Sequence, residues 1–146
     1  MCDPGWRVIH VHADGWDVIK NPGLKFIRHP GMEALPIPEP GGKLSELGNF
    51  VNATGPDLLL VTAFLIMSFH PTGPYPVLLL HGEQGSCKST CARVLRELVD
   101  PNSAPLRSRP RTDRELAISA DHSWLISFDN LSTVSDWFSD LSLIHI

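Results

Sequence analysis

The sequence has few cysteines, no excess of positive charge and no long hydrophobic run. The spacing of its three cysteines, Cys2, Cys87 and Cys91, fits neither a disulfide framework nor a zinc site. The 12 Lys and Arg residues against 16 Asp and Glu residues give a formal net charge of −4, so the chain as a whole has no basic field for nucleic acid. The longest apolar run, residues 58–67, is far shorter than the ~20 residues that cross a bilayer. We therefore expect a cytoplasmic protein that does not enter a membrane.

The most informative segment is the run HGEQGSCKST at residues 81–90. It follows an apolar run at residues 77–80 that is typical of a buried strand, and it precedes a helical pattern over residues 88–99. A strand, a glycine-containing loop and a helix in this order predict a phosphate-binding loop. Backbone N–H groups in such a loop, together with the helix N-terminus, attract phosphate oxygens. The alternative is a strand–helix turn that binds nothing.

The residues of this loop have individual predicted roles. Lys88 is predicted to reach the β- and γ-phosphates of a nucleoside triphosphate, and the Ser89 hydroxyl to bind Mg²⁺. The pattern G-x-x-x-x-G-K-[ST] has glycine before the lysine, where this chain has Cys87. The predicted cofactors are ATP and Mg²⁺. The predicted nucleotide-binding residues are Gly82, Glu83, Gln84, Gly85, Ser86, Cys87, Lys88, Ser89 and Thr90.

A second apolar run, residues 124–129, ends in the carboxylate of Asp129. Ligands bind at the carboxyl ends of parallel strands, so Asp129 is predicted to hold Mg²⁺ opposite Ser89; a turn-capping role is the alternative. Asn130 stands where many ATPases have a glutamate that activates water. An amide does not take up a proton near neutral pH, so Asn130 could only orient the water, and Glu83 or a later residue could supply the base. The predicted catalytic residues are Lys88, Asp129 and Asn130.

The chain divides into three parts. Residues 1–42 are a β-rich N-terminal segment followed by a Pro/Gly-rich linker, with strand patterns at 6–11, 15–19 and 25–28 and the linker at 29–42. Residues 43–140 have helix patterns at 43–51, 57–69 and 88–99, a capping box at 112–115 and strand patterns at 77–80, 104–108 and 124–129. Alternating strands and helices predict an α/β core with a parallel sheet. Residues 141–146 match the translation of a sequencing adapter and are left out of the fold prediction.

Two smaller clusters have more than one interpretation. His10 and His12 share one face of a predicted strand, but no third ligand accompanies them, which favours a polar strand face over a metal site. The local basic cluster could contact nucleic-acid phosphates or a neighbouring subunit's nucleotide, although a solvated connection is the commoner outcome. This cluster consists of Arg107, Arg109, Arg111 and Arg114.

Several of these motifs together resemble a family of phage and mobile-element P-loop ATPases that are helicase- or primase-associated. The segments that carry the resemblance are residues 72–90, which begin with TGPYP, and residues 92–95, 99–101 and 127–132 (SFDNLS). The resemblance implies an AAA+ or superfamily III helicase-like core. It also implies a homo-oligomeric ring that hydrolyses ATP on single-stranded DNA beside a primase-type module. By position it assigns phosphate and Mg²⁺ binding to Lys88, Ser89 and Asp129, and the family usually has alanine in place of Cys87.

The same resemblance implies that the core is incomplete at its C-terminus. Two further strands, a polar sensor residue and an arginine finger are expected after residue 140, and the unpaired strand at 77–80 is then an aggregation hazard. The fragment alone is expected to hydrolyse ATP slowly, if at all. Two other functions stay open at this point: a nucleotide-gated switch with little hydrolysis, suggested by Asn130, and an inert truncated product.

Overall fold

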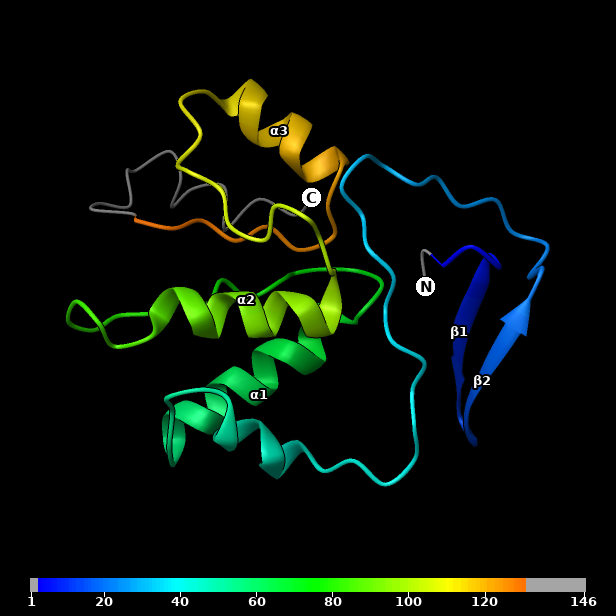
Figure 1. Cartoon of the computed structure of the whole chain (residues 1–146), viewed down its shortest axis with the longest axis horizontal. Helices are drawn as coiled ribbons and strands as arrows, with labels where there is room; N and C mark the ends of the chain where they lie inside the picture. The colour runs from blue at the N-terminus through cyan, green and yellow to red at the C-terminus, as the bar shows by residue number, and fades with distance from the viewer. Residues whose placement is uncertain (1–2, 131–146) are drawn as a thin grey trace.

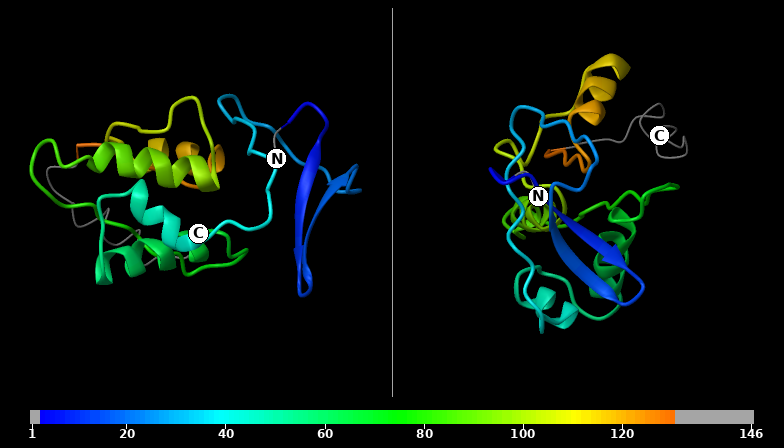
Figure 2. Two further views of the ribbon diagram at one scale, coloured as in Figure 1. Left: turned by 60° about the horizontal axis from the view of Figure 1, so that its bottom comes forward. Right: turned by 90° about the vertical axis from the view of Figure 1, so that its right-hand side faces the viewer.

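The structure, a computed structural model, describes residues 3–130 (Figure 1). Its elements are the strands β1 (Arg7–His12) and β2 (Gly15–Lys20), the 3₁₀ helix η1 (Leu44–Asn49), and the helices α1 (Pro56–Ser68), α2 (Lys88–Val99) and α3 (Asp113–Asp121). The β1–β2 hairpin lies to one side of the helices in Figure 1 and in the left view of Figure 2. The adapter-like residues 141–146 lie outside the described residues, as does Cys2.

The two N-terminal strands form an antiparallel hairpin, as the sequence predicted. Their register runs from Arg7 opposite Lys20 to His12 opposite Gly15. His10 and His12 lie on one face, with ring centroids 5.4 Å apart. The His12 Nε2 atom lies 3.1 Å from a carboxylate oxygen of Asp17 on the opposite strand. Within residues 3–130 no group of three metal-ligating side chains is present.

The prediction of a third strand at residues 25–28 was wrong. These residues are not in a strand and lie outside the two-stranded sheet. The guanidinium of Arg28 instead lies 3.6 Å from the ring centroid of Trp6 and donates a hydrogen bond to the backbone carbonyl of Asp3. Contacts of this side chain with the N-terminal turn thus replace the backbone pairing that a third strand needs.

The hydrophobic core lies between η1, α1 and α2. Its buried side chains are Leu47, Val51, Val61, Leu65, Cys91, Leu95 and Val99. The α1 helix begins at Pro56, a residue that suits a first helical position because it needs no N–H donor there. One face of α1 packs on the core, whereas Leu59, Leu60 and Ile66 are more than half exposed. The prediction of a helix here is confirmed, but its burial is one-sided. The helix predicted over residues 43–51 is a tighter 3₁₀ helix over Leu44–Asn49.

The predicted parallel strands are present only in part. Residues 77–80 are extended and pack Leu78 and Leu80 on the core, but they have no ladder partner within residues 3–130 and are not a strand. The segments around residues 104–108 and 124–129 meet in a single parallel bridge between Arg107 and Phe128. A strand is defined by its hydrogen bonds to neighbours, so apolar runs without a full set of neighbours remain extended coil.

The Pro/Gly-rich linker is docked on the helical part of the chain. Met32 and Asn102 form an antiparallel bridge. The Glu33 N–H donates to the Pro101 carbonyl at 3.0 Å, and the Ser103 N–H donates to the Gly31 carbonyl at 2.9 Å. These bonds hold the linker against the turn after α2. In the part of the chain that is described, no helix is long and apolar enough to cross a membrane.

Candidate functional site

The loop that precedes α2 needs glycine at Gly82. This residue has φ +153°, and a Cβ atom added there would lie 2.7 Å from the Ser86 Oγ atom. That hydroxyl has a structural role, because it donates to the Glu83 carbonyl at 2.8 Å. Gly85 also has a positive φ, +86°. Both glycines that the sequence motif singled out therefore have backbone conformations that L side chains rarely adopt.

Cys87 has the left-handed conformation that the motif usually gives to glycine. It has φ 61° and ψ 23° and is the N-cap residue of α2, without a side-chain capping bond. Its Sγ atom lies 3.8 Å from the Gly85 carbonyl oxygen. A non-glycine residue in this region costs on the order of 1–3 kcal/mol. Cysteine at this position therefore carries backbone strain that glycine would not.

The Lys88 ammonium group lies inside the loop. It donates to the carbonyl of Gly82 at 2.8 Å, to the carbonyl of Glu83 at 2.6 Å and to the Ser86 hydroxyl at 3.1 Å. All three acceptors come from the turn that precedes the helix. The curled loop therefore surrounds a single positive charge at the N-terminus of α2, where the helix dipole adds further positive potential.

Ser89 and Asp129 are brought together, as the sequence predicted. The Ser89 hydroxyl donates to the Asp129 carboxylate, with distances of 3.0 Å to Oδ1 and 3.1 Å to Oδ2. The two residues are 40 positions apart in the sequence. A hydroxyl and a carboxylate side by side next to a lysine suit Mg²⁺, which prefers oxygen ligands and binds through one or two carboxylates together with phosphate oxygens.

Backbone pairing fixes the position of Asp129. The Arg107 N–H donates to the Ser127 carbonyl, and the Asp129 N–H donates to the Arg107 carbonyl, both at 2.9 Å. Asn130 follows with φ 63°, and its N–H donates to the Asp129 Oδ1 atom at 2.9 Å. The extended segment therefore stops at Asp129, and the backbone turns away at Asn130, a residue type that tolerates the left-handed region.

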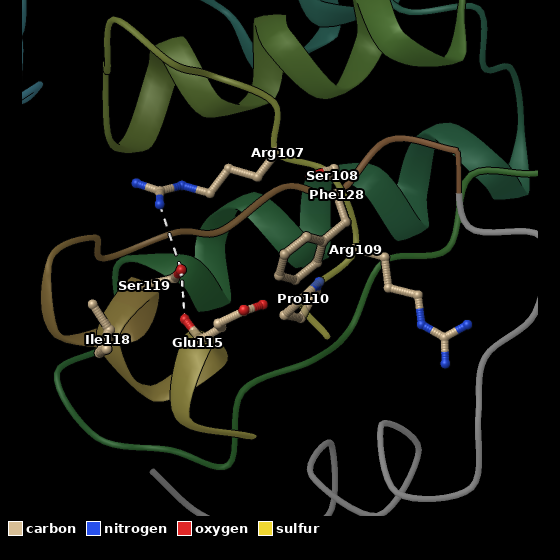
Figure 3. A pocket seen from close by; sticks show the side chains of 8 residues that line it. All are labelled: Arg107, Ser108, Arg109, Pro110, Glu115, Ile118, Ser119 and Phe128. Carbon is tan, nitrogen blue, oxygen red and sulfur yellow. Dashed lines mark hydrogen bonds between the residues drawn. The ribbon is translucent and has the colours of Figure 1, made fainter. Parts of the chain in front are cut away.

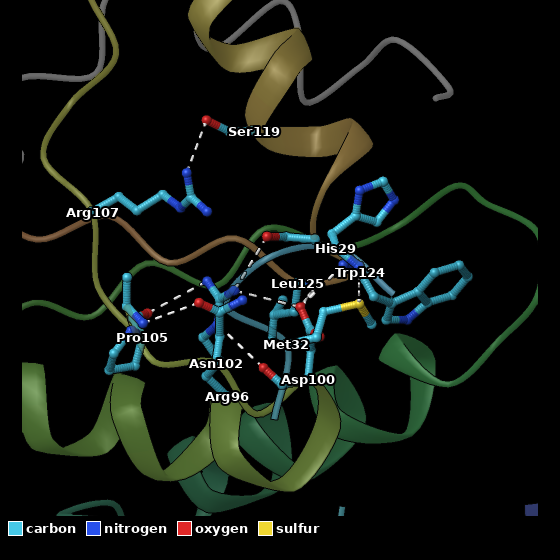
Figure 4. Close-up of polar contacts among 12 residues, drawn as sticks. His29, Met32, Arg96, Asp100, Asn102, Pro105, Arg107, Ser119, Trp124 and Leu125 are labelled. Atoms are coloured by element: carbon cyan, nitrogen blue, oxygen red, sulfur yellow. Dashed lines mark hydrogen bonds and ion pairs between the residues drawn. The ribbon is translucent and has the colours of Figure 1, made fainter. Parts of the chain in front are cut away.

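A buried ion pair attaches this segment to the end of α2 (Figure 4). Arg96 is fully buried, and its guanidinium lies 3.5 Å from the Asp100 Oδ2 atom. It also donates to the hydroxyl of Ser123 at 3.3 Å. Asp100 Oδ2 accepts the backbone N–H groups of Trp124 at 3.0 Å and Leu125 at 3.2 Å. Burial lowers the pKa of Arg96, and the charge of Asp100 opposes that shift.

Sequence reasoning missed this ion pair. Arg96 and Asp100 are spaced one helical turn apart, as many exposed pairs are, and this spacing alone does not distinguish a buried pair from an exposed one. A usable signal was the position of Arg96 between the apolar Leu95 and Val99 on the core side of an amphipathic helix. The effect of the pair on the site is indirect, since it aligns the segment that ends in Asp129 with the helix that begins at Lys88.

Members of the arginine cluster have different surroundings. Arg107 donates to the Ser119 hydroxyl at 3.4 Å (Figure 3), and its buried Nε atom has no hydrogen-bond partner among residues 3–130. Arg107 and Arg109 line a hollow of about 450 Å³ together with Ser108, Pro110, Glu115, Ile118, Ser119 and Phe128. The Arg111 N–H donates to the Glu115 carboxylate at 2.7 Å. The cluster is thus partly structural rather than uniformly solvated.

The capping box predicted before α3 is present. The Thr112 hydroxyl accepts the Glu115 N–H at 3.3 Å. The Glu115 side chain bonds back to the N–H of Arg111 rather than to that of Thr112, so the reciprocal bond is shifted by one residue. This cap fixes the start of α3, the helix that contains Arg114 and follows the other three arginines of the cluster.

The comparison with protein families gives one finding. The family model described as "Actinomycete integrative conjugative element replication protein" matches residues 42–146. No curated protein and no solved structure matches the chain. The assignment to a phage and mobile-element P-loop ATPase family, made from the sequence motifs, was wrong. The matching family is a replication family of an integrative conjugative element, so the expected context of DNA replication in a mobile element is confirmed.

Proposed function

The chain belongs to the family of actinomycete integrative conjugative element replication proteins, and we propose that it binds ATP and Mg²⁺ at residues 82–90 to support replication of the element's DNA. The single observation that carries the nucleotide proposal is the contact between Ser89 and Asp129. It joins the first turn of α2, at the residue that follows Lys88, to the end of the 124–129 segment. When bound, Mg²⁺ would neutralise phosphate charge.

The chain's own groups account for nucleotide binding by simple electrostatics. Lys88 is held by neutral acceptors, two carbonyls and a hydroxyl, so it has no carboxylate partner there to compete with a phosphate. Backbone N–H groups at the start of α2 lack helical partners and can donate to an anion. The residues that would hold the metal are Ser89 and Asp129, and the residues that would surround the phosphates are those of the loop at 82–90.

We further propose that the Arg107–Phe128 bridge is part of a parallel α/β sheet. Its two hydrogen bonds have the parallel pattern, and α3 lies on the connection between the two segments, which is how parallel neighbours are usually joined. The extended residues 77–80 would belong to the same sheet. Such a core suits an ATP-hydrolysing motor that assembles as a homo-oligomeric ring on single-stranded DNA with a primase-type partner.

A nucleotide-gated switch is the second candidate function, and Asn130 favours it. Asn130 directly follows Asp129 and has an amide in place of a carboxylate, so it cannot act as a base toward water. A protein of this kind would bind ATP tightly, change its assembly state and hydrolyse the nucleotide rarely.

Affinity and turnover measured on one preparation separate the two functions. ATP affinity is measured by calorimetry and phosphate release by a coupled assay, each with and without single-stranded DNA. A motor gives turnover that rises with DNA and disappears in Lys88→Ala, whereas a switch gives tight binding with little turnover. The exposed residue Lys43 supplies the control variant Lys43→Ala. Absence of ATP binding by the unmodified protein would contradict both.

A further inference from the structure

Three aromatic rings are exposed on or next to the β1–β2 hairpin. Trp6 is 48% exposed, Trp16 is 40% exposed and Phe26 is 51% exposed. Trp6 and residues 21–27 line a hollow of about 630 Å³. Large apolar side chains that gather on a surface mark a binding site more often than isolated ones do. This surface, formed by Trp6 and residues 20–28, lies outside the part of the chain that the family model matches.

The hollow is built on a fixed charged framework. Asp3 is buried, and its carboxylate accepts the Arg7 N–H at 2.9 Å as well as the Arg7 guanidinium. The hydrogen bond from the Arg7 side chain lowers the pKa of Asp3, so this carboxylate stays ionised. The Asp3 carbonyl accepts the guanidinium of Arg28, which lies over the Trp6 ring. One face of Trp6 is thus covered by a cation while the ring as a whole stays half exposed.

The charge on this surface is of one sign. Residues 18–32 contain Lys20, Lys25 and Arg28 and no Asp or Glu, in a chain whose net charge is −4. Lys20 and Lys25 are exposed and form no ion pair within residues 3–130. The nearest acidic side chain before this stretch, Asp17, is paired with His12. The surface therefore combines exposed rings with uncompensated positive charge.

We propose that this surface binds single-stranded DNA, with unpaired bases stacked on Phe26 and Trp6 and with phosphates held by Lys20, Lys25 and Arg28. Every base has a π-face, so exposed aromatic rings bind single strands with little dependence on sequence. In a duplex those faces are already stacked on one another, so the rings favour a single strand. The choice of DNA follows from the replication family to which the chain belongs. The proposal does not depend on ATP binding at residues 82–90.

The test is fluorescence anisotropy of the full chain with a labelled 20-nucleotide oligo-dT at a series of salt concentrations. Phe26→Ala is expected to weaken binding about tenfold, because stacking on one ring contributes that much per base. Lys20→Gln with Lys25→Gln is expected to reduce the slope of log affinity against log salt by about 1.4. The matched controls are Phe50→Ala and Lys43→Gln, an exposed ring and an exposed cation elsewhere on the chain, and they are expected to bind as the unmodified protein does.

Three results would overturn the proposal. One is no binding of oligo-dT even at low salt, which would favour a protein as the ligand of the hollow. The second is binding that Phe26→Ala and Phe50→Ala weaken equally. The third is equal or tighter binding of a duplex of the same length. Lys88→Ala is expected to bind oligo-dT normally while Phe26→Ala binds ATP normally, so failure of the DNA proposal and failure of the ATP proposal give different patterns.

Discussion

The Ser89 hydroxyl, in the first turn of α2, donates a hydrogen bond to the carboxylate of Asp129, 40 residues later in the chain. This contact joins the loop before α2 to the end of the segment that pairs with Arg107. A simple strand–helix turn does not require a contact between Ser89 and Asp129. The nucleotide proposal rests on this contact, together with the Lys88 ammonium, which neutral acceptors of the loop hold.

Removing either proposed metal ligand, Ser89 or Asp129, is expected to weaken ATP binding only when Mg²⁺ is present. Asp129→Asn retains the shape of the side chain but removes its charge, and we expect a loss of ATP affinity of at least about tenfold in Mg²⁺ and no loss in EDTA. Ser89→Ala should act in the same way. The double variant Ser89→Ala/Asp129→Asn should lose less ATP-binding free energy than the sum of the losses in the two single variants, because both side chains would bind one ion.

Calorimetric titration of ATP in Mg²⁺ and in EDTA measures this difference. The control is Asp121→Asn, which removes a highly exposed carboxylate at the end of α3. It should change the ATP affinity neither in Mg²⁺ nor in EDTA. Equal losses in Mg²⁺ and in EDTA would show that Asp129 has a structural role alone.

Adding one methyl group at Gly82 is expected to disturb the loop. In Gly82→Ala the new Cβ would meet the Ser86 Oγ atom at 2.7 Å, and the backbone has φ +153°. We expect a loss of about 1–3 kcal/mol of stability and weaker ATP binding, because Ser86 also holds Lys88. Gly42→Ala is the control, since a Cβ there meets nothing within 4 Å. Urea unfolding and ATP titration of both variants provide the measurement, and identical behaviour of the two would refute the role of Gly82.

Replacing Arg96 is expected to be severely destabilising. Arg96→Met leaves the Asp100 carboxylate buried without its cation, which costs about 3–5 kcal/mol. Arg93→Met on the exposed side of the same helix should change stability by less than about 0.5 kcal/mol. Urea midpoints, or soluble yield if Arg96→Met does not fold, measure the difference. Similar effects of the two substitutions would contradict the burial of the ion pair.

The two cysteines of α2 are expected to differ in reactivity. Cys87 is exposed and Cys91 is buried, and burial raises the pKa of the Cys91 thiol, which lowers the thiolate fraction that reacts. At pH 8 a maleimide should label Cys87 rapidly and Cys91 only after unfolding. ATP with Mg²⁺ should slow the labelling of Cys87. Peptide mass spectrometry resolves each site, and rapid labelling of folded Cys91, or no protection of Cys87 by ATP, would count against the account.

Local patterns predicted the helices and the hairpin well. The α2 helix begins and ends at Lys88 and Val99 as predicted, because an amphipathic pattern and a glycine-containing loop bound it. The capping box before α3 and the strands β1 and β2 were also found from residues adjacent in the sequence. These features depend on interactions within a few residues, which a sequence displays directly.

Features that depend on distant partners were predicted less well. Residues 25–28 have a strand pattern, but Arg28 bonds to the N-terminal turn instead. Residues 77–80 are apolar enough for a strand, but no strand lies beside them within residues 3–130. The Ser89–Asp129 contact was predicted because each residue belonged to a recognisable motif. The Arg96–Asp100 pair was missed because burial depends on what packs over the helix.

The most direct test of the central claim is a calorimetric titration of ATP with Mg²⁺ into the full chain and into Lys88→Ala, with Lys43→Ala as the control. The account predicts saturable binding to the unmodified protein and to Lys43→Ala, and a loss of at least about tenfold in Lys88→Ala. The same affinity in Lys88→Ala as in the unmodified protein, or no binding by any of the three, would contradict the claim that residues 82–90 hold a nucleotide.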